Sequence, residues 1–397
     1  MKNTPQLFTI IGDSEITLIS GRIDEKNNFE LLEKLFFPIE GIGDNKILDL
    51  EKIINLIKKN TFLIEQKVNY IFKDIIIILD NLEISFLNFS GFKKLNGTQI
   101  SKENITYLLN SLKSCVDEFE KSKKILHIFN SEYCLDKKKL DNLPIGLFGD
   151  FYSHELSFNL INKNDHKNLE NIFKKCNLKI KKILLESFVR GSLINEKNPK
   201  VDTFLYVQIK NENSKIFFVE NNSIKFEQKF NFGTDIILKD ISKITSLSSD
   251  TIKQVISDNE NINKLFFDEL LEEKYFINQQ YRKIKKKLIL EIAEARIQEI
   301  CKIFYLKNIN LKKKIEAIDL IFLDVDDLKH FKCFHNTYKN NFALNNTYGI
   351  KVVRKLSVEE IANKAINIVQ FGWNKEVIPF AKSKKSIIAR VFQQIFN

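Results

Sequence analysis

Metal-ligating residue types cluster near the end of the sequence. His330, Cys333 and His335 place three residues of the types that bind zinc within six positions. A zinc site normally has four ligands, and no fourth ligand stands nearby. We therefore predict no metal site here.

Three aspartates stand just upstream, and they could hold Mg²⁺. Asp324, Asp326 and Asp327 follow a short apolar segment, so we predict a solvated turn at the end of a strand. His127 lies within another apolar segment, and we predict a hydrogen-bonded core residue instead of a catalytic base.

The sequence does not contain the common motifs of catalytic and phosphate-binding sites. Neither G-x-S-x-G nor H-E-x-x-H occurs, and neither G-x-x-x-x-G-K-[ST] nor G-x-G-x-x-G occurs. We therefore predict no catalytic residue.

Composition limits the classes of protein that remain. The chain has 397 residues, 62 Lys and Arg against 51 Asp and Glu, and five cysteines in no C-x-x-C pair. An odd number of cysteines without this spacing argues against a disulfide-bonded scaffold and fits a protein of the reducing cytoplasm. The longest purely aliphatic run is Ile75–Leu79, so we expect a soluble or peripheral protein. A net charge of +11 favours a polyanionic partner: nucleic acid, an anionic membrane surface or an acidic peptide.

Two lysine runs offer possible docking faces. Lys285–Lys287 and Lys312–Lys314 are interpreted first as solvated helix ends, and second as a surface for an acidic peptide or a nucleic acid. No aromatic RNA-binding motif and no DNA-reading motif accompanies them, so we expect no nucleic-acid partner.

The last sixteen residues, 382–397, combine an apolar helical face with positive charge and no acidic residue. This pattern is typical of a helix that lies in a membrane interface, and each cation near an anionic leaflet contributes about 1 kcal/mol. A terminal helix docked on the protein or on a partner is the alternative. The predicted membrane residues are Lys384, Lys385, Ile387, Ile388, Arg390, Val391, Phe392, Ile395 and Phe396.

Hydrophobic periodicity predicts strands and helices that alternate along the chain. The predicted strands are two within Phe8–Ile23, then Ile75–Leu79, Ile84–Phe89, Ile125–Phe129, Phe204–Ile209, Lys215–Val219, Ile224–Phe230 and Leu320–Leu323. The predicted helices are Leu48–Gln66, Ile105–Phe119, Asp165–Cys176 with Asp165 as N-cap, Asp235–Ile244, Ser249–Asp258, Arg282–Phe304 and Val358–Val369. Their order predicts two α/β lobes.

Several blocks of sequence, in order along nearly the whole chain, each resemble a motif of one protein family. They are Asn45–Ile54, Ile125–Asp136, Asn142–Gly149, Asn168–Leu178, Phe230–Ile241 and Ile289–Ile300. The second is similar to "vLH-x-x-P-x-x-Y-x-lD" and the last to "iI-x-x-R-x-x-Ei". Together with the basic tail, these blocks resemble FtsA, the bacterial cell-division family of actin-like membrane tethers for FtsZ. The resemblance implies an actin-like, ribonuclease H-like α/β fold of two lobes.

The two phosphate-loop motifs of this family are degenerate here. The family's D-I-G-T-S-K-V stands as Ile10–Ile16, with Ile10 for the acid and Glu15 for the lysine. The family's D-I-G-G-G-T-T-D stands as Gln208–Lys215, where the first acid and all three glycines are replaced. Glycine permits close backbone approach to phosphate. We therefore expect no cofactor, lost or weak binding of ATP and Mg²⁺, and no enzymatic activity. The residual site would comprise Gly12, Asp13, Ser14 and Ser214.

The resemblance also implies a division into subdomains. The first core subdomain would be 1–83 with 163–198, and 84–162 would be the FtsA-specific insertion, called 1C. The second core would be 199–240 with 315–381, and 241–314 its satellite, 2B. Residues 382–397 would be the membrane-targeting helix.

By this resemblance the chain would tether the FtsZ ring to the cytoplasmic side of the inner membrane at the division site. The satellite would receive the C-terminal peptide of FtsZ on Arg296, with Lys286 and Lys287 as secondary contacts. The insertion would serve self-association into filaments and later division proteins. The alternatives are an active actin-like ATPase and a related scaffold of a pilus or secretion platform.

Overall fold

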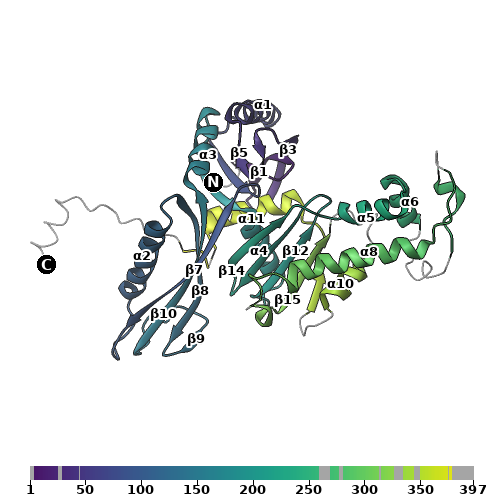
Figure 1. Ribbon diagram of the computed structural model, residues 1–397. Helices are drawn as coiled ribbons and strands as arrows, with labels where there is room; N and C mark the ends of the chain where they lie inside the picture. The colour runs from purple at the N-terminus through teal and green to yellow at the C-terminus, as the bar shows by residue number, and fades with distance from the viewer. Residues whose placement is uncertain are drawn as a thin grey trace, which may run out of the picture. The chain divides into compact units, whose positions relative to one another are not determined.

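The computed structural model shows two compact units of chain (Figure 1). Unit 1 comprises Met1–Phe86 and Asn164–Phe371, and unit 2 comprises Leu87–Lys163 and Gly372–Asn397. The structure describes residues 4–25, 29–43, 45–258, 269–276, 280–312, 314–325, 334–343, 349–373 and 375–377.

The first sheet of unit 1 has the strand order β11-β6-β1-β2-β3. Its strands are β1 (Gln6–Ile11), β2 (Glu15–Ile23), β3 (Phe29–Pro38), β6 (Asp74–Leu79) and β11 (Lys179–Leu185). The central β6 pairs in parallel with both β1 and β11, and its apolar run Ile75–Leu79 is buried throughout. A parallel strand needs such a run because helices cover both faces of its sheet.

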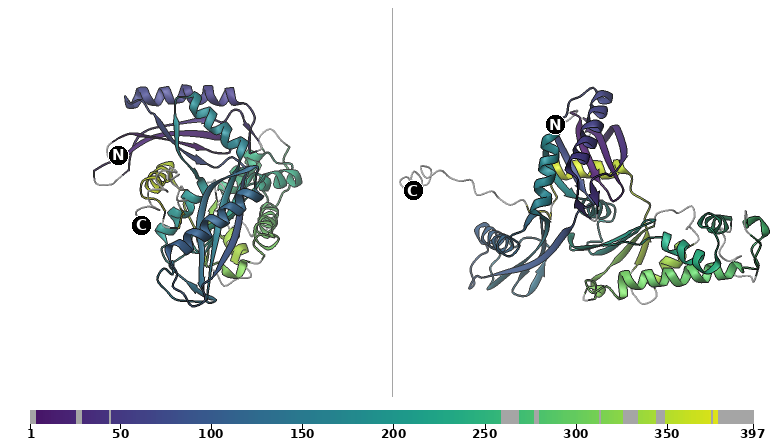
Figure 2. Two further views of the ribbon diagram at one scale, coloured as in Figure 1. Left: turned by 90° about the vertical axis from the view of Figure 1, so that its left-hand side faces the viewer. Right: turned by 45° about the horizontal axis from the view of Figure 1, so that its top comes forward.

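Helices cover this sheet on both sides. Figures 1 and 2 show α1 (Leu50–Val68) and α3 (Lys163–Lys175) on one side, and α4 (Glu186–Lys197) and α11 (Val358–Phe371) on the other. A two-strand ribbon, β4 (Ile42–Gly43) and β5 (Lys46–Ile47), precedes α1.

The second sheet of unit 1 has the order β14-β13-β12-β15-β16. Its strands are β12 (Phe204–Ile209), β13 (Ser214–Glu220), β14 (Ser223–Phe230), β15 (Leu320–Val325) and β16 (Gly349–Val352). The other elements of this part are α5 (Asp235–Thr245), α6 (Ser249–Asp258), η1 (Glu273–Tyr275), α8 (Lys286–Cys301), the π-helical η2 (Lys302–Leu306), η3 (Ile315–Ala317) and α10 (His335–Ala343).

Alternation along these strands divides the second sheet into two faces. Leu205, Val207 and Ile209 of β12 join the buried core that packs with α5, α6, α8 and α10. Successive side chains of a strand point to opposite faces. Tyr206 and Gln208 therefore point away from that core, and both are buried.

The described residues of unit 2 form a four-stranded antiparallel sheet packed against one helix. The strand order is β7-β10-β8-β9. The elements are β7 (Ile84–Lys94), α2 (Lys102–Phe119), β8 (Lys123–Leu135), β9 (Lys138–Leu140) and β10 (Phe151–Asn162). Leu112 and Val116 of α2 pack on Ile128 of β8 and Leu156 of β10.

Most of the predicted elements are confirmed, with three corrections. The helix predicted from Arg282 begins at Lys286. Asp165 lies inside the first turn of α3 and is not its N-cap. Asp324 is buried within β15 and does not lie in a solvated turn. Among the described residues, no helix has both the length and the hydropathy needed to cross a membrane.

Candidate functional site

Three carboxylates gather at one edge of the first sheet of unit 1. Asp80 follows β6 directly, Glu186 follows β11 as the first residue of α4, and Asp13 lies in the turn between β1 and β2. The strands end level with one another, because Leu79 pairs with both Ile11 and Leu185. In open α/β sheets the carboxyl ends of the strands are where ligands bind.

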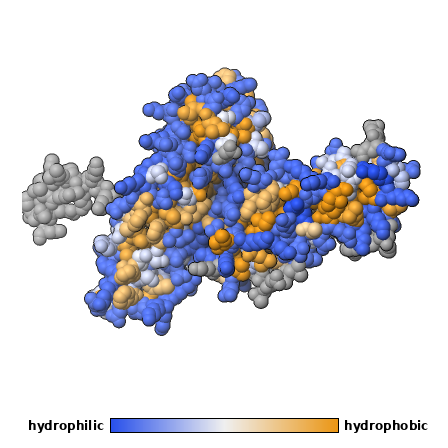
Figure 3. Space-filling model, viewed as in Figure 1, coloured by the Kyte–Doolittle hydropathy of each residue, from blue (hydrophilic) through white to orange (hydrophobic). Residues whose placement is uncertain are grey.

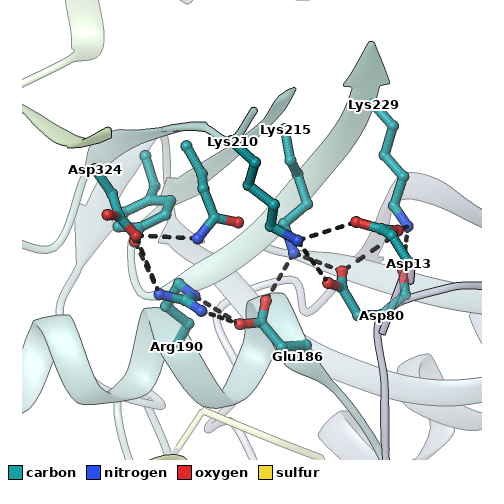
Figure 4. A network of polar contacts seen from close by, with 10 residues as sticks. Asp13, Asp80, Glu186, Arg190, Lys210, Lys215, Lys229 and Asp324 are labelled. Atoms are coloured by element: carbon teal, nitrogen blue, oxygen red, sulfur yellow. Dashed lines mark hydrogen bonds and ion pairs between the residues drawn. The ribbon is translucent and has the colours of Figure 1, made fainter. Parts of the chain in front are cut away.

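The second sheet presents a row of polar side chains to the same space. Gln208 pairs with Lys215 across β12 and β13, and with Asp324 across β12 and β15. All three are buried. Lys210, just after β12, and Lys229, in β14, add two further amines (Figure 4).

Ion pairs join the two sheets through the three lysines. Lys215 Nζ lies 2.7 Å from Asp80 Oδ1 and 2.7 Å from Glu186 Oε2. Lys210 Nζ lies 3.0 Å from Asp13 Oδ2, and Lys229 Nζ lies 3.3 Å from Asp13 Oδ1 (Figure 4). Lys229 Nζ also donates to the carbonyl of Asp80.

A second set of contacts extends the network along α4. Arg190, one turn after Glu186, donates from Nε to that carboxylate at 2.7 Å. Asp324 accepts hydrogen bonds from the Tyr206 hydroxyl at 2.6 Å and the Gln208 amide at 3.0 Å, and Arg190 Nη1 approaches it at 3.5 Å. We call the residues of these two paragraphs the cleft network.

Neighbouring cations lower the pKa values of two buried carboxyl groups in the cleft network. Burial alone would raise the pKa of Asp80, but Lys215, Lys229 and Lys210 outweigh it and hold that pKa well below its usual range. Burial is likewise outweighed at Glu186, where Arg190 and Lys215 lower the pKa to about 2. The carboxyl groups of Asp80 and Glu186 therefore remain charged at neutral pH.

The charges of the cleft network balance. The four cations Arg190, Lys210, Lys215 and Lys229 contact the four carboxylates Asp13, Asp80, Glu186 and Asp324. Glu227 lies near Lys215, and burial raises its pKa. The described residues of the network thus leave no surplus of positive charge for an anion.

Gly233 fixes the hairpin turn from which Lys210 projects. A Cβ atom at this position would lie 2.0 Å from the carbonyl oxygen of Lys210. The N–H groups of Thr234 and Asp235 donate at 2.9 Å to the carbonyls of Lys210 and Asn211. Only a residue without a side chain permits this approach.

Of the residual nucleotide-site residues, only Asp13 belongs to the cleft network. The Gly12 N–H closes the β1–β2 turn on the Glu15 carbonyl at 3.0 Å. Ser14 is exposed. The Ser214 hydroxyl donates to the carbonyl of Phe232 at 2.7 Å and so holds a neighbouring turn.

The predicted FtsZ-binding residues all lie on α8. The Arg296 side chain is 26% exposed and contacts Asp240 of α5, as well as Glu299 at 2.6 Å. Lys286 is nearly buried against Glu269 at 3.0 Å. Lys287 is 47% exposed. Ten positions separate Lys286 from Arg296, about 15 Å along the helix.

Two sets of predicted residues lie outside the described part of the chain. The first is the membrane segment, 382–397, and the second includes Asp326, Asp327, His330 and Cys333. The described residues contain no cluster of three or more His, Cys, Asp or Glu side chains suited to a metal ion.

Most residues of the cleft network were not predicted from the sequence. Lys215 and Asp324 stand at positions of apolar strands whose neighbours are buried, and such a pattern indicates a charge with a partner. Glu186 and Arg190 show the four-residue spacing of a helical ion pair. The strand partners could not be found without the topology.

Comparison with known proteins gives weak but extended similarities. No protein-family model matches the chain. It is 20% identical over 316 residues to the cell division protein FtsA of Buchnera aphidicola subsp. Schizaphis graminum, covering 77% of this chain and 73% of that protein. It is 22% identical over 307 residues to FtsA of Buchnera aphidicola subsp. Baizongia pistaciae, covering 70% and 72%. The chain is a divergent relative of the FtsA cell division proteins.

The fold agrees with this relationship. A solved PilM–PilN type IV pilus biogenesis complex superposes with a TM-score of 0.51 at 9% identity, covering 92% of this chain and 98% of that one. At this identity the likeness concerns the fold alone. The chain has the mixed α/β, actin-like fold that the FtsA resemblance implied.

The cleft of this FtsA relative does not fit a nucleotide triphosphate with Mg²⁺. In the FtsA pattern the β12–β13 hairpin carries glycines and acids, but here Lys210 replaces the first glycine and Lys215 the last acid. Both amines already bind carboxylates. Gln208 replaces the first acid and donates to Asp324. A triphosphate would have to separate these pairs and bring its own negative charge beside Asp13 and Asp80.

A polar cavity remains beside the cleft network. Its volume is about 340 Å³, and Asn45, Asn81, Asn213 and Asn231 contribute amides to its lining. This volume is at the lower end for ligand pockets. The charged groups on its wall, among them Asp13 and Lys229, contact each other.

Proposed function

We propose that this chain is an FtsA-type cell division scaffold that links FtsZ to the membrane with no nucleotide in its cleft. The similarity to FtsA proteins over about three quarters of the chain supports the cell-division role. The cleft network carries the second part of the proposal, because ion pairs occupy the place of the phosphate loops.

The membrane link rests on residues 382–397. They carry Lys384, Lys385 and Arg390 with six large apolar residues at helical spacing. Such a segment binds anionic lipid through charge and burial of apolar area together. We place the chain on the cytoplasmic side of the inner membrane, at the division site.

The FtsZ contact rests on the surface of α5 and α8. Arg296 and Lys287 are partly exposed there. Figure 3 shows apolar residues over the same region. On these two helices, Ile244 of α5 is 59% exposed and Leu288 of α8 is 37% exposed. A peptide with both acidic and apolar residues would find complementary groups on this surface. The C-terminal peptide of FtsZ is the proposed ligand.

Unit 2 offers a surface for self-association and for later division proteins. Phe92 and Phe148 are 71% and 70% exposed, and the Phe92 ring lies 6.2 Å from the ring of Phe151. Exposed aromatic groups of this kind are enriched at protein interfaces. We propose that copies of the chain, or later division proteins, bind here.

Flotation tests the function. The full chain, mixed with anionic vesicles and FtsZ, should float and bring FtsZ with it, whereas a chain that ends at Lys382 should leave both behind. Failure of the full chain to float would overturn the proposal. Release of phosphate from Mg·ATP by the purified chain would instead favour the active ATPase.

A further inference from the structure

A short segment after α11 pairs with the open edge of the unit 2 sheet. β9 pairs only with Tyr133–Leu135 of β8, so the preceding part of β8 lies at the edge. There the Asn130 N–H donates to the Lys375 carbonyl at 2.8 Å, and the Val377 N–H donates to the Ile128 carbonyl at 2.7 Å. The segment therefore acts as an added antiparallel strand.

The Glu376 side chain is held on one face of β8. It lies opposite Phe129 in the added bridge. Glu376 Oε1 is 2.8 Å from His127 Nδ1, with the two side chains 7% and 0% exposed. The His127 ring stacks on Phe129 at 5.7 Å. Burial of a polar side chain costs free energy unless the side chain has a hydrogen-bond partner. The contact between Glu376 and His127 therefore favours the conformation in which the segment is paired with β8.

Val377 is held on the other face. It packs against the apolar cluster that contains Ile128, Leu156 and Val116. Because successive side chains of a strand alternate between faces, the two contacts together fix the register of pairing. A slip of one residue would move Glu376 toward the apolar cluster.

We propose that the edge of β8 at residues 127–130 is a binding site for an extended segment with an acidic residue followed by an apolar one. Its occupant is the chain's own Lys375–Val377, which we call the tail clasp. The tail clasp fixes the position of Val377, the residue that precedes the C-terminal residues 378–397. Any role of the tail clasp in membrane attachment rests on the proposed function. The pairing of Lys375–Val377 with β8 does not depend on that function.

The tail clasp limits the reach of the tail. Five residues lead from Val377 to Lys382, and they span at most about 18 Å when fully extended. Without the clasp the free length would begin at Phe371, where α11 ends. The eleven residues from there to Lys382 span at most about 40 Å. Release of the clasp would thus roughly double the reach.

Hydrogen–deuterium exchange on the full chain tests the tail clasp. The Val377 amide should exchange at least about tenfold more slowly than in an unstructured peptide. A double variant that swaps two neighbours, Glu376→Val with Val377→Glu, keeps the composition and inverts the faces, so it should lose this protection. Glu118→Ala, at an exposed glutamate of α2, is the matched control and should retain it.

The outcomes separate the clasp from the membrane role. Exchange of Val377 at the unstructured rate in the unaltered chain would overturn the proposal, as would full protection in the swapped variant. If the Val377 amide is protected in the unaltered chain and loses this protection in the swapped variant, the tail clasp is supported. This holds even if the chain does not float with vesicles, because that result would refute only the proposed function.

Discussion

The amine of Lys215 in the second sheet of unit 1 lies 2.7 Å from the carboxylate of Asp80 in the first sheet. Both side chains are almost completely buried. In the FtsA pattern the position of Lys215 carries an acid, so the sign of the charge is reversed here. This relative thus holds the two sides of its cleft together with its own side chains.

Removal of the Lys215 amine should destabilise the protein. Lys215→Met removes the cation that Asp80 and Glu186 share, while Lys210 and Lys229 stay beside Asp80 and Arg190 beside Glu186. Removal of one partner from a buried ion pair costs up to about 3–5 kcal/mol, and the remaining cations should keep the loss toward the lower end of this range. The free energy of unfolding in urea measures the loss. Lys197→Met is the matched control, because its partner Glu360 forms an exposed pair worth about 1 kcal/mol or less. Equal losses in the two variants would contradict the prediction.

Acid should weaken the fold through Glu186. The pKa of this carboxyl is lowered from 4.5 to about 2 in the folded chain. The contribution of Glu186 to the free energy of unfolding is complete above pH 4.5 and is lost as the pH falls from 4.5 toward 2. Asp80, whose pKa is also lowered, acts in the same direction, whereas Glu227, whose pKa is raised by burial, opposes it.

The pH dependence is measured by urea unfolding at several pH values. The Glu186→Gln variant has no proton to bind at this position, so its stability should fall less steeply with acid than that of the unaltered chain. Parallel pH profiles for the two proteins would show that Glu186 does not contribute as described.

Mg·ATP should leave the melting temperature unchanged. A ligand at 100 times its Kd stabilises a protein by about 2.7 kcal/mol, an effect that thermal unfolding readily detects. We expect no shift at about 1 mM Mg·ATP, because the lysines of the cleft network are already paired with carboxylates. Isothermal titration gives the direct check, and micromolar affinity would refute the nucleotide-free cleft.

Neutralising Arg296 should weaken binding of the FtsZ C-terminal peptide. We choose Arg296→Gln because an acid would be repelled by Asp240 and Glu299, which contact Arg296. Loss of one charge contact should lower the affinity about tenfold, or 1.4 kcal/mol. Fluorescence anisotropy measures it, with Lys174→Gln on α3 as a control of equal charge change. An unchanged Kd for Arg296→Gln would exclude this arginine from the site.

The fold was largely predictable where the hydrophobic pattern is strong. Strand β6 was predicted from the apolar run Ile75–Leu79, and strands β12–β14 from the apolar residues of Phe204–Phe230, because these side chains are buried in the core. The edge strand β3 was missed. Its side chains are only partly buried, so its sequence has no clear apolar period.

The cleft network could be predicted only in part. The loss of the glycines and of the first acid in Gln208–Lys215 indicated a cleft unsuited to ATP. What replaces the nucleotide depends on strand register, which sets Lys215 beside Gln208 and Asp324. The turn sets the register of the β12–β13 hairpin locally. Gln208 and Asp324 are 116 residues apart in the sequence, so the pairing of β12 with β15 could not be found from a local pattern.

Nucleotide dependence of FtsZ recruitment is the most direct test of the whole account. The full chain and a chain that ends at Lys382 would each be mixed with anionic vesicles and FtsZ from the same organism, with and without Mg·ATP, and then floated. We predict that the full chain brings FtsZ to the vesicles equally well in both conditions and that the shortened chain brings none. Recruitment that requires Mg·ATP, or that persists without residues 383–397, would contradict the account.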